Sequence, residues 1–302
     1  MRIGVDLGGT KIEAAVIDPE GRLRLSRRMA TPAGDYAGTI EAVRALVAEI
    51  EAVLGQSCPV GIGMPGSLSP GTGLVRNSNS TCLNGRRFDR DLGRALARPL
   101  RFANDANCFA LSEAIDGAAA GAALVFGVIL GTGVGGGIVA NGRLLTGANA
   151  IAGEWGHSPL PWPGDAERPG PSCYCGKQGC NETFLSGPGL AHDHRAATGE
   201  ALDAALIAAR AEAGDAGAEA SLARYEDRLA RGLAVVINLL DPDVIVLGGG
   251  LGRIGRLYRN VPRLWGSYVF ADSVTTRLLP PSHGDASGVR GAAWLWGRDE
   301  AT

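Results

Sequence analysis

Short apolar runs separated by glycine-rich turns open the chain, which is typical of consecutive β-strands. The first thirty residues predict strands at 3–5, 12–17 and 23–29, joined by turns at Gly8-Gly9 and at 19–21. Further apolar runs predict strands at 60–64, 100–103, 124–130, 136–140 and 244–247.

Apolar residues spaced three and four positions apart predict helices between these strands. The predicted helices are 39–54, 88–96, 104–116, 186–197, 201–213, 218–240 and a final one within 288–297. Residues 154–180, rich in Pro, Gly, Trp and Cys, predict an ordered loop, and Gly248-Gly249-Gly250 predicts a turn into a helix. The mixture of strands and helices predicts an α/β fold.

One layout occurs twice: a strand, a glycine-threonine turn and a returning strand, around 5–10 and again around 129–133. This repeat predicts two similar lobes that each offer a turn to a shared cleft. We expect an N-terminal lobe of residues 1–117 and a C-terminal lobe of residues 118–302. A helix at about 288–298 is expected to pack back on the first lobe.

Composition narrows the function classes. The 302 residues carry a net charge of -2, which argues against a general nucleic-acid-binding surface. The sequence shows no signal peptide and no apolar run long enough to cross a bilayer, so we expect a cytoplasmic protein without a membrane partner. In that compartment the six cysteines are not expected to form disulfides, and their clustering indicates metal instead.

Two glycine-threonine turns are candidate phosphate sites, because consecutive backbone N–H groups in such turns form an anion-binding concavity. They are Gly8-Gly9-Thr10 and Gly131-Thr132-Gly133. Asp6 would face the phosphates through a hydrated Mg²⁺, and Lys11 would add positive charge. Either turn alone is equally consistent with an ordinary hairpin. The pair, together with Gly248-Gly249-Gly250, favours nucleotide binding.

Asp105 follows the predicted strand 100–103 and suits the role of a base that accepts a hydroxyl proton during phosphoryl transfer. Asn104 would hold a neighbouring hydroxyl. Asp is also common as a helix N-cap, and this segment alone favours that plainer interpretation of Asp105.

Cys173, Cys175 and Cys180 place three thiols within eight residues, and His157 offers a fourth ligand. Three cysteines and a histidine form a closed set typical of structural zinc. The alternative, three free thiols, is weaker because such thiols are prone to oxidation. Glu154 and Glu182 flank this loop and would be rigid acceptors for a polyhydroxylated ligand, or else ordinary surface residues.

Taken together, these motifs resemble the ROK family (repressors, open reading frames, kinases) of the actin-hexokinase superfamily over essentially the whole chain. The resemblance rests on 6–11, 104–107, 130–133, 154–157, 173–182 and 248–250. It implies a two-lobed actin/hexokinase-like, ribonuclease H-like fold with a cleft between the lobes, and often a homodimer. Asn181 departs from the family pattern, which usually has an apolar residue there.

The resemblance also implies roles for individual residues. Asp105 would be the catalytic base, and ATP would bind through both Gly/Thr turns with Gly248, Gly249 and Gly250 near its adenosine. Zinc would be bound by His157, Cys173, Cys175 and Cys180. The implied sugar contacts are Gly66, Asn79, Asn104, Asp105, Glu154, His157 and Glu182.

Within the family, residues 77–81, 153–162 and 283–296 look most like bacterial fructokinases of the mannofructokinase type. The expected activity is therefore transfer of phosphate from ATP to the 6-hydroxyl of fructose, with mannose as a second substrate. An N-acetylglucosamine kinase, a glucokinase and a non-catalytic sugar sensor are the alternatives. A repressor of this family carries an N-terminal helix-turn-helix domain, for which a first strand at Ile3 leaves no room.

Overall fold

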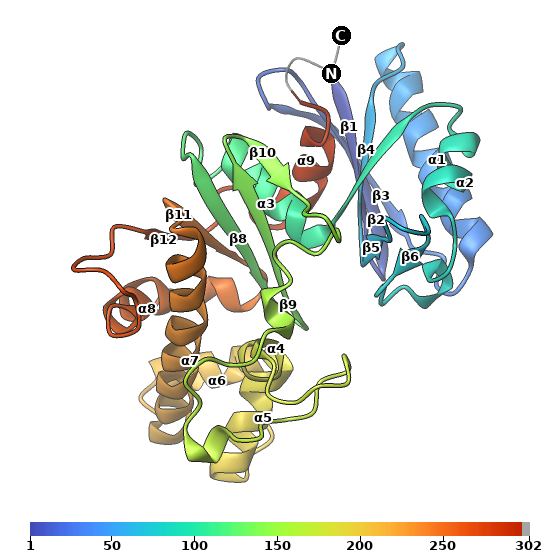
Figure 1. Cartoon of the computed structure of the whole chain (residues 1–302). Helices are drawn as coiled ribbons and strands as arrows, with labels where there is room; N and C mark the ends of the chain where they lie inside the picture. Colours follow the sequence, from blue (N-terminus) through green and yellow to red (C-terminus); the bar gives the residue numbers. More distant parts are fainter. Residues whose placement is uncertain (298–302) are drawn as a thin grey trace. The chain divides into compact units, whose positions relative to one another are not determined.

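The computed structural model describes residues 1–297 and divides the chain into two compact units (Figure 1). Unit 1 comprises residues 1–120, 142–152 and the chain from 282 onward, and unit 2 comprises 121–141 and 153–281. The predicted lobes differ from these units mainly at 142–152, which groups with unit 1. Residue 298 of the predicted last helix lies outside the described residues.

Unit 1 is built on a mixed sheet whose strands run in the order β3-β2-β1-β4-β7. These strands are β1 (Arg2–Leu7), β2 (Lys11–Ile17), β3 (Leu23–Ala30), β4 (Val60–Met64) and β7 (Leu100–Asn104). β1 pairs antiparallel with β2 and parallel with β4. Short elements of the same unit are β5 (Ser67–Leu68), β6 (Val75–Arg76), η1 (Thr81–Leu83), β10 (Arg143–Leu145) and η5 (Gly284–Ala286).

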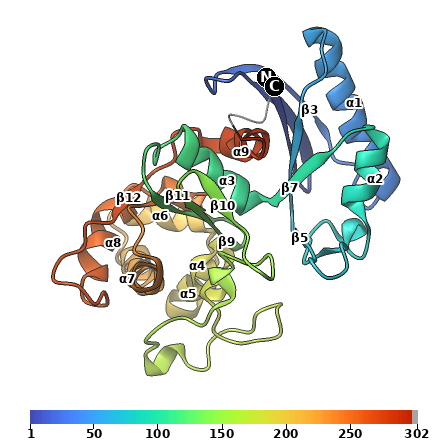
Figure 2. The same ribbon diagram turned by 45° about the horizontal axis from the view of Figure 1, so that its top comes forward.

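Helices cover both faces of this sheet, α1 and α2 on one and α3 and α9 on the other (Figures 1 and 2). They are α1 (Tyr36–Leu54), α2 (Phe88–Ala95), α3 (Asp105–Ile115) and α9 (Ser287–Trp294). Alternation along β1 explains the two faces. Ile3, Val5 and Leu7 join the buried core that includes α1, whereas a Cβ on Gly4 would meet Val289 O of α9 at 1.9 Å. Glycine is therefore needed where α9 packs on the strand.

Unit 2 repeats the same pattern of a hairpin followed by parallel strands, with β9-β8-β11-β12 as neighbours. Its strands are β8 (Leu124–Leu130), β9 (Val134–Ala140), β11 (Val244–Gly248) and β12 (Arg277–Leu279). Its α-helices are α4 (Asn181–Leu185), α5 (Gly187–Thr198), α6 (Ala204–Glu212), α7 (Ala216–Leu240) and α8 (Leu257–Trp265). The 3₁₀ turns are η2 (Trp155–His157), η3 (Asp165–Glu167) and η4 (Leu251–Arg253).

Several predicted boundaries differ from the structure, among them the starts of α1 and α8. α1 begins at Tyr36 instead of residue 39, because Asp35 caps it by accepting a hydrogen bond of 2.9 Å from the N–H of Gly38. The glycines at 248–250 lead into the short 3₁₀ turn η4, and α8 starts only at Leu257. Across residues 1–297, no helix combines the length and apolar character needed to span a membrane.

Candidate active site

Asp105 is the first residue of α3 and follows β7 directly. Asn104 is the N-cap instead, since its side chain accepts a hydrogen bond of 2.7 Å from the N–H of Asn107. The interpretation of Asp105 as the N-cap is therefore wrong. The Asp105 side chain is exposed, and desolvation by the surrounding protein still raises the pKa of its carboxyl. An accessible carboxylate with a raised pKa is suited to accept a proton.

Asp6 lies near the end of β1 and close enough to Asp105 for the two carboxylates to repel each other. Burial, followed by the charges of Asp105 and Glu13, raises the pKa of Asp6 to about 6. A divalent cation would relieve this repulsion, so the two carboxylates fit a hydrated Mg²⁺.

The turn after β1 exposes its central residues. Gly8 donates a backbone hydrogen bond of 3.0 Å to Lys11 O, and Gly9 and Thr10 are exposed. The Lys11 ammonium is 4.0 Å from the Glu13 carboxylate. Lys11 therefore already has an acidic neighbour, which reduces the charge that it offers to a phosphate.

Two further sugar-contact candidates lie in unit 1. Asn79 is exposed and lines a cavity of about 140 Å³ together with Gly9 and Thr31. Gly66 has φ +75°, and a Cβ there would lie 2.4 Å from Arg76 O. A backbone turn packed this closely explains the glycine at position 66 without any ligand.

The second Gly/Thr turn joins β8 to β9 in unit 2. Gly131 N–H donates to Gly133 O at 3.0 Å, and Glu182 Oε2 accepts a hydrogen bond of 2.9 Å from the N–H of Val134. A Cβ on Gly133 would lie 2.7 Å from the same Glu182 oxygen. Glu182 thus supports the turn, a role that the sequence did not reveal.

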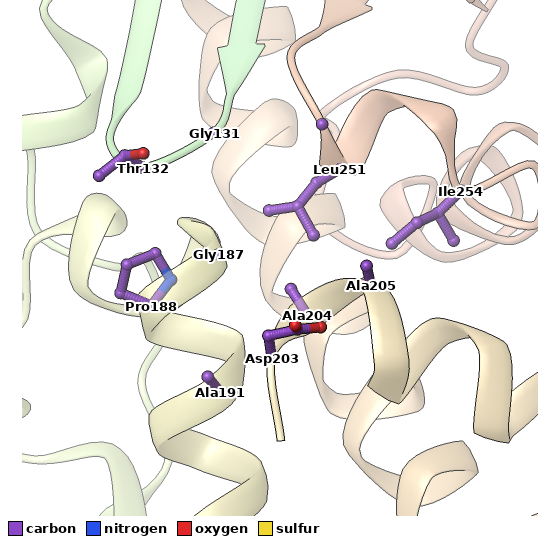
Figure 3. Close-up of a pocket in the computed structure, with 11 residues that line it drawn as sticks. Gly131, Thr132, Gly187, Pro188, Ala191, Asp203, Ala204, Ala205, Leu251 and Ile254 are labelled. Atoms are coloured by element: carbon purple, nitrogen blue, oxygen red, sulfur yellow. The ribbon is translucent and has the colours of Figure 1, made fainter. Parts of the chain in front are cut away.

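A pocket of about 570 Å³ lies beside this turn (Figure 3). It is lined by Gly131, Thr132, Gly187, Pro188, Ala191, Asp203, Ala204, Ala205, Gly250, Leu251 and Ile254. Gly249 packs against the end of β8, where a Cβ would lie 2.4 Å from Leu130 O. This contact brings Gly250 and the turn at 131–133 into one pocket. Its volume and mostly apolar lining are typical of small-molecule sites.

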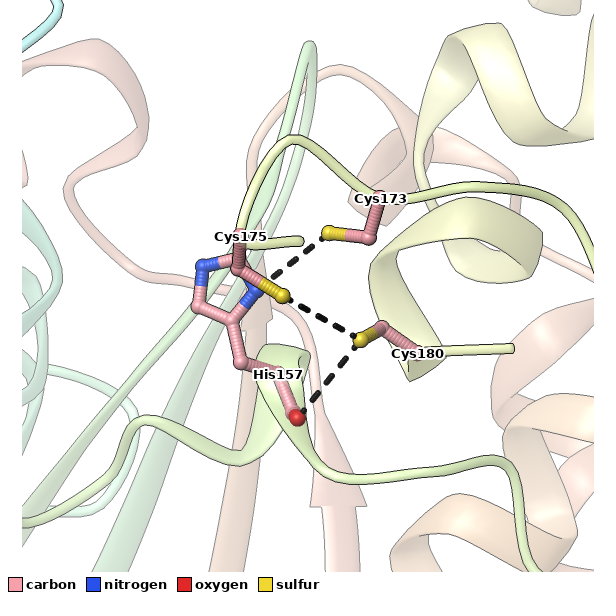
Figure 4. A group of neighbouring side chains, drawn as sticks. All are labelled: His157, Cys173, Cys175 and Cys180. Atoms are coloured by element: carbon pink, nitrogen blue, oxygen red, sulfur yellow. Dashed lines mark hydrogen bonds between the residues drawn. The ribbon is translucent and has the colours of Figure 1, made fainter. Parts of the chain in front are cut away.

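His157, Cys173, Cys175 and Cys180 converge on one point, with ligand atoms all within 4.8 Å of one another (Figure 4). His157 Nδ1 lies 3.6 Å from Cys173 Sγ, and the Sγ atoms of Cys175 and Cys180 are also 3.6 Å apart. Tetrahedral bonds of about 2.0–2.3 Å to zinc place ligand atoms at about this separation. The residues therefore fit a structural zinc ion.

Asn181 anchors this loop to the segment that carries Glu154 and His157. Its Nδ2 donates a buried hydrogen bond of 3.0 Å to Trp155 O, and its N–H donates one of 2.8 Å to Ser158 O. The departure from the apolar residue usual in the family thus adds a polar link between the two segments.

Tyr174 lies beside the predicted sugar contacts of unit 2. Its side chain is 78% exposed, and its hydroxyl lies 3.0 Å from His157 Nε2. Desolvation and the nearby carboxylates of Glu182 and Glu154 raise its pKa to about 12. Glu154, His157, Tyr174 and Glu182 therefore form one polar group, of which sequence reasoning missed Tyr174.

Comparison with known proteins decides the family. A model described as the ROK family matches residues 2–299. The chain belongs to the ROK family. It is 40% identical over 301 residues to the N-acetyl-D-glucosamine kinase of Salmonella gallinarum, covering 98% of this chain and 99% of that protein.

Two solved ROK structures are similar over nearly the whole chain. The ROK hexokinase of Thermus thermophilus is 32% identical with a TM-score of 0.87, covering 99% of both chains. A Streptomyces griseus ROK glucokinase, in complex with glucose and AMPPNP, is 29% identical with a TM-score of 0.77, covering 97% of this chain and 98% of that one. These similarities confirm the predicted ROK sugar kinase and its hexokinase-like α/β fold. They do not single out the fructokinase type.

Proposed function

We propose that this ROK protein transfers the γ-phosphoryl group of ATP to the 6-hydroxyl of N-acetylglucosamine. The observation that supports phosphoryl transfer to a hydroxyl is the exposed Asp105 carboxylate, whose pKa is raised. The choice of sugar rests on 40% identity to an N-acetyl-D-glucosamine kinase along the full length of both chains. The predicted fructose kinase becomes the competing hypothesis, supported only by the resemblance of three short segments.

In this proposal Asp105 accepts the proton of the sugar 6-hydroxyl as its oxygen bonds to the γ-phosphorus. The bond from that phosphorus to the bridging oxygen breaks, and ADP leaves. Asn104 Oδ1 is occupied by its capping hydrogen bond, so Asn104 Nδ2 is the atom assigned to a sugar oxygen. The raised pKa makes the Asp105 carboxylate a stronger base, which favours proton acceptance.

ATP is assigned to the 570 Å³ pocket of unit 2 because the pocket ends at the exposed Thr132 of the glycine-threonine turn. Backbone N–H groups of such turns and the threonine hydroxyl bind phosphate oxygens. Leu251 and Ile254 supply an apolar surface for the base, and Gly250 leaves room beside it because a Cβ there meets nothing within 4 Å. The turn at 8–10 in unit 1 is assigned to the terminal phosphates.

The sugar is assigned to Glu154, His157 and Glu182 in unit 2, and to Gly66, Asn79, Asn104 and Asp105 in unit 1. Carboxylates and imidazole nitrogens accept or donate hydrogen bonds to sugar hydroxyls. His157 would serve two purposes, because its Nδ1 faces the cysteine group while its Nε2 faces Tyr174. The cysteine loop would thereby fix a sugar-binding side chain.

Two metal ions are part of the proposal. Zinc, bound by His157, Cys173, Cys175 and Cys180, would supply rigidity to the loop instead of chemistry. Mg²⁺ near Asp6 would supply positive charge to the phosphates. The protein's own contribution at Asp6 is a half-buried carboxylate next to Asp105.

A panel of sugars with ATP tests the substrate assignment. N-acetylglucosamine is expected to give the highest kcat/KM among N-acetylglucosamine, glucose, mannose and fructose, with the product phosphorylated at O6 as seen by NMR. A preference for fructose would restore the fructokinase prediction. ATP consumption that no sugar stimulates would contradict the proposed function altogether.

A further inference from the structure

Asp203 is an acidic side chain in an otherwise weakly polar pocket. Thr132 and Asp203 carry the polar side chains of the 570 Å³ pocket, and the other lining residues are glycine, proline, alanine, leucine and isoleucine. In Figure 3 the Asp203 side chain lies next to Ala204 at the start of α6, below Leu251 in this view. A ligand in this pocket is therefore expected to present a group that a carboxylate can bind.

One Asp203 oxygen is already engaged. Asp203 is the N-cap of α6, and its Oδ1 accepts a hydrogen bond of 2.8 Å from the N–H of Leu206. The second oxygen, Oδ2, has no hydrogen bond or ion pair with any residue of 1–297. The cap fixes the side chain while Oδ2 remains available in the pocket. An acceptor held in place in this way loses little conformational entropy when a ligand donates to it.

The charge of Asp203 restricts what it binds. A carboxylate repels phosphate oxygens, so it is unsuited to the phosphate end of a nucleotide. It accepts hydrogen bonds from neutral donors, and an adenosine offers two kinds, the ribose hydroxyls and the exocyclic amine. The phosphates are assigned to the turn at Thr132, and the base to Leu251 and Ile254. The ribose joins phosphate to base, and Asp203 lines the same pocket as Thr132, Leu251 and Ile254.

We propose that Asp203 is a specificity-determining residue that accepts a hydrogen bond from a ribose hydroxyl of the nucleotide. The proposal rests on the assignment of ATP to this pocket under the proposed function. It adds a preference of the enzyme for ribonucleotides over 2′- or 3′-deoxyribonucleotides.

The chain offers a matched control for the capping role. Asp215 caps α7 in the same way, accepting a hydrogen bond of 2.8 Å from the N–H of Ala218. It does not line the pocket, and its Oδ2 has a cationic neighbour, Arg210, at 4.0 Å. Serine is as good an N-cap as aspartate, so Asp203→Ser and Asp215→Ser both preserve a cap while removing the second oxygen.

The test is calorimetric binding of ADP, 2′-deoxyADP, 3′-deoxyADP and purine riboside diphosphate, which lacks the amine. The wild type is expected to bind ADP about tenfold or more tightly than one of the deoxy forms, as for a hydrogen bond to a charged acceptor. Asp203→Ser should weaken the binding of ADP but not of that deoxy form, so the ratio of their affinities should fall close to one. Asp215→Ser should leave this ratio unchanged.

Other results would overturn the proposal. If Asp203→Ser weakens the binding of ADP and of both deoxy forms equally, the residue has only a structural role. If Asp203→Ser changes only the ratio of the affinities for ADP and purine riboside diphosphate, Asp203 binds the amine of the base instead. Equal affinity of the wild type for ADP and for both deoxy forms would also refute the proposal. Because binding is measured without a sugar, a protein that binds ADP as expected but phosphorylates no sugar counts against the proposed function alone.

Discussion

The Nε2 atom of His157 lies 3.0 Å from the hydroxyl oxygen of Tyr174, whose ring packs edge-to-face on the imidazole at 5.1 Å. If Nδ1 binds a metal ion, Nε2 carries the proton and donates it to Tyr174. That proton is then withheld from a sugar hydroxyl. Tyr174→Phe keeps the ring and removes the competing acceptor.

We therefore expect Tyr174→Phe to lower KM for the sugar about threefold to tenfold, the range of one neutral hydrogen bond, with kcat and KM for ATP unchanged. Steady-state kinetics measure this directly. Tyr268→Phe is the control, because its hydroxyl bonds to Asp227 instead. A higher KM for the sugar in Tyr174→Phe would show that the tyrosine hydroxyl binds the sugar itself.

The cysteine group predicts about one zinc ion per chain, since four ligand atoms suffice for a closed tetrahedral site. Cys175→Ser removes one of these ligands and is expected to reduce the zinc content severalfold. It should lower Tm by on the order of 5 °C or more, because metal binding contributes to folding. Elemental analysis and thermal unfolding measure both effects.

Cys82→Ser is the matched change for this experiment, because Cys82 lies in unit 1, outside the group of four. It should retain the zinc content and nearly the Tm of the wild type. The zinc assignment would be refuted if the purified wild type contained no zinc and a chelator left its Tm unchanged.

Asp6 predicts a stability effect that depends on pH. Its pKa is about 6 in the folded protein, against about 3.9 in an unfolded chain, so its ionisation destabilises the fold above pH 6. Asp6→Asn should therefore stabilise the nucleotide-free protein by about 2 kcal/mol at pH 8. The gain should shrink between pH 6 and pH 4, because wild-type Asp6 becomes protonated first in the folded state and then in the unfolded chain.

Asp18 provides a comparison of opposite sign, to be measured by the same denaturant unfolding series. Burial alone would raise its pKa, but hydrogen bonds from Arg22 and Arg24 outweigh that and lower it to about 2. Asp18→Asn should thus destabilise the protein at pH 8. Destabilisation by Asp6→Asn at pH 8 would contradict the raised pKa of Asp6, which burial and then the charges of Asp105 and Glu13 produce.

Local patterns predicted much of the fold because each strand and helix has its own periodicity. The hairpin of β1 and β2 and that of β8 and β9 were both visible as apolar runs around a Gly/Thr turn. Short strands such as β12 were missed, since three residues carry too little pattern.

The candidate site was predictable where a motif has an unusual composition, as in the three cysteines near His157. It was not predictable where the role depends on packing. Asp203 has the pattern of a plain N-cap, and only the approach of α6 to the turn at Thr132, some seventy residues earlier, makes it line a pocket. Tyr174 likewise becomes relevant only when the loop folds onto His157.

The rate of ADP formation by the wild type and by Asp105→Asn, with ATP, Mg²⁺ and saturating N-acetylglucosamine, tests the central claim most directly. The wild type should depend on the sugar for turnover, and the variant should lose about 100-fold or more in kcat because it cannot accept the hydroxyl proton. Comparable sugar-dependent turnover by the two proteins would contradict the account.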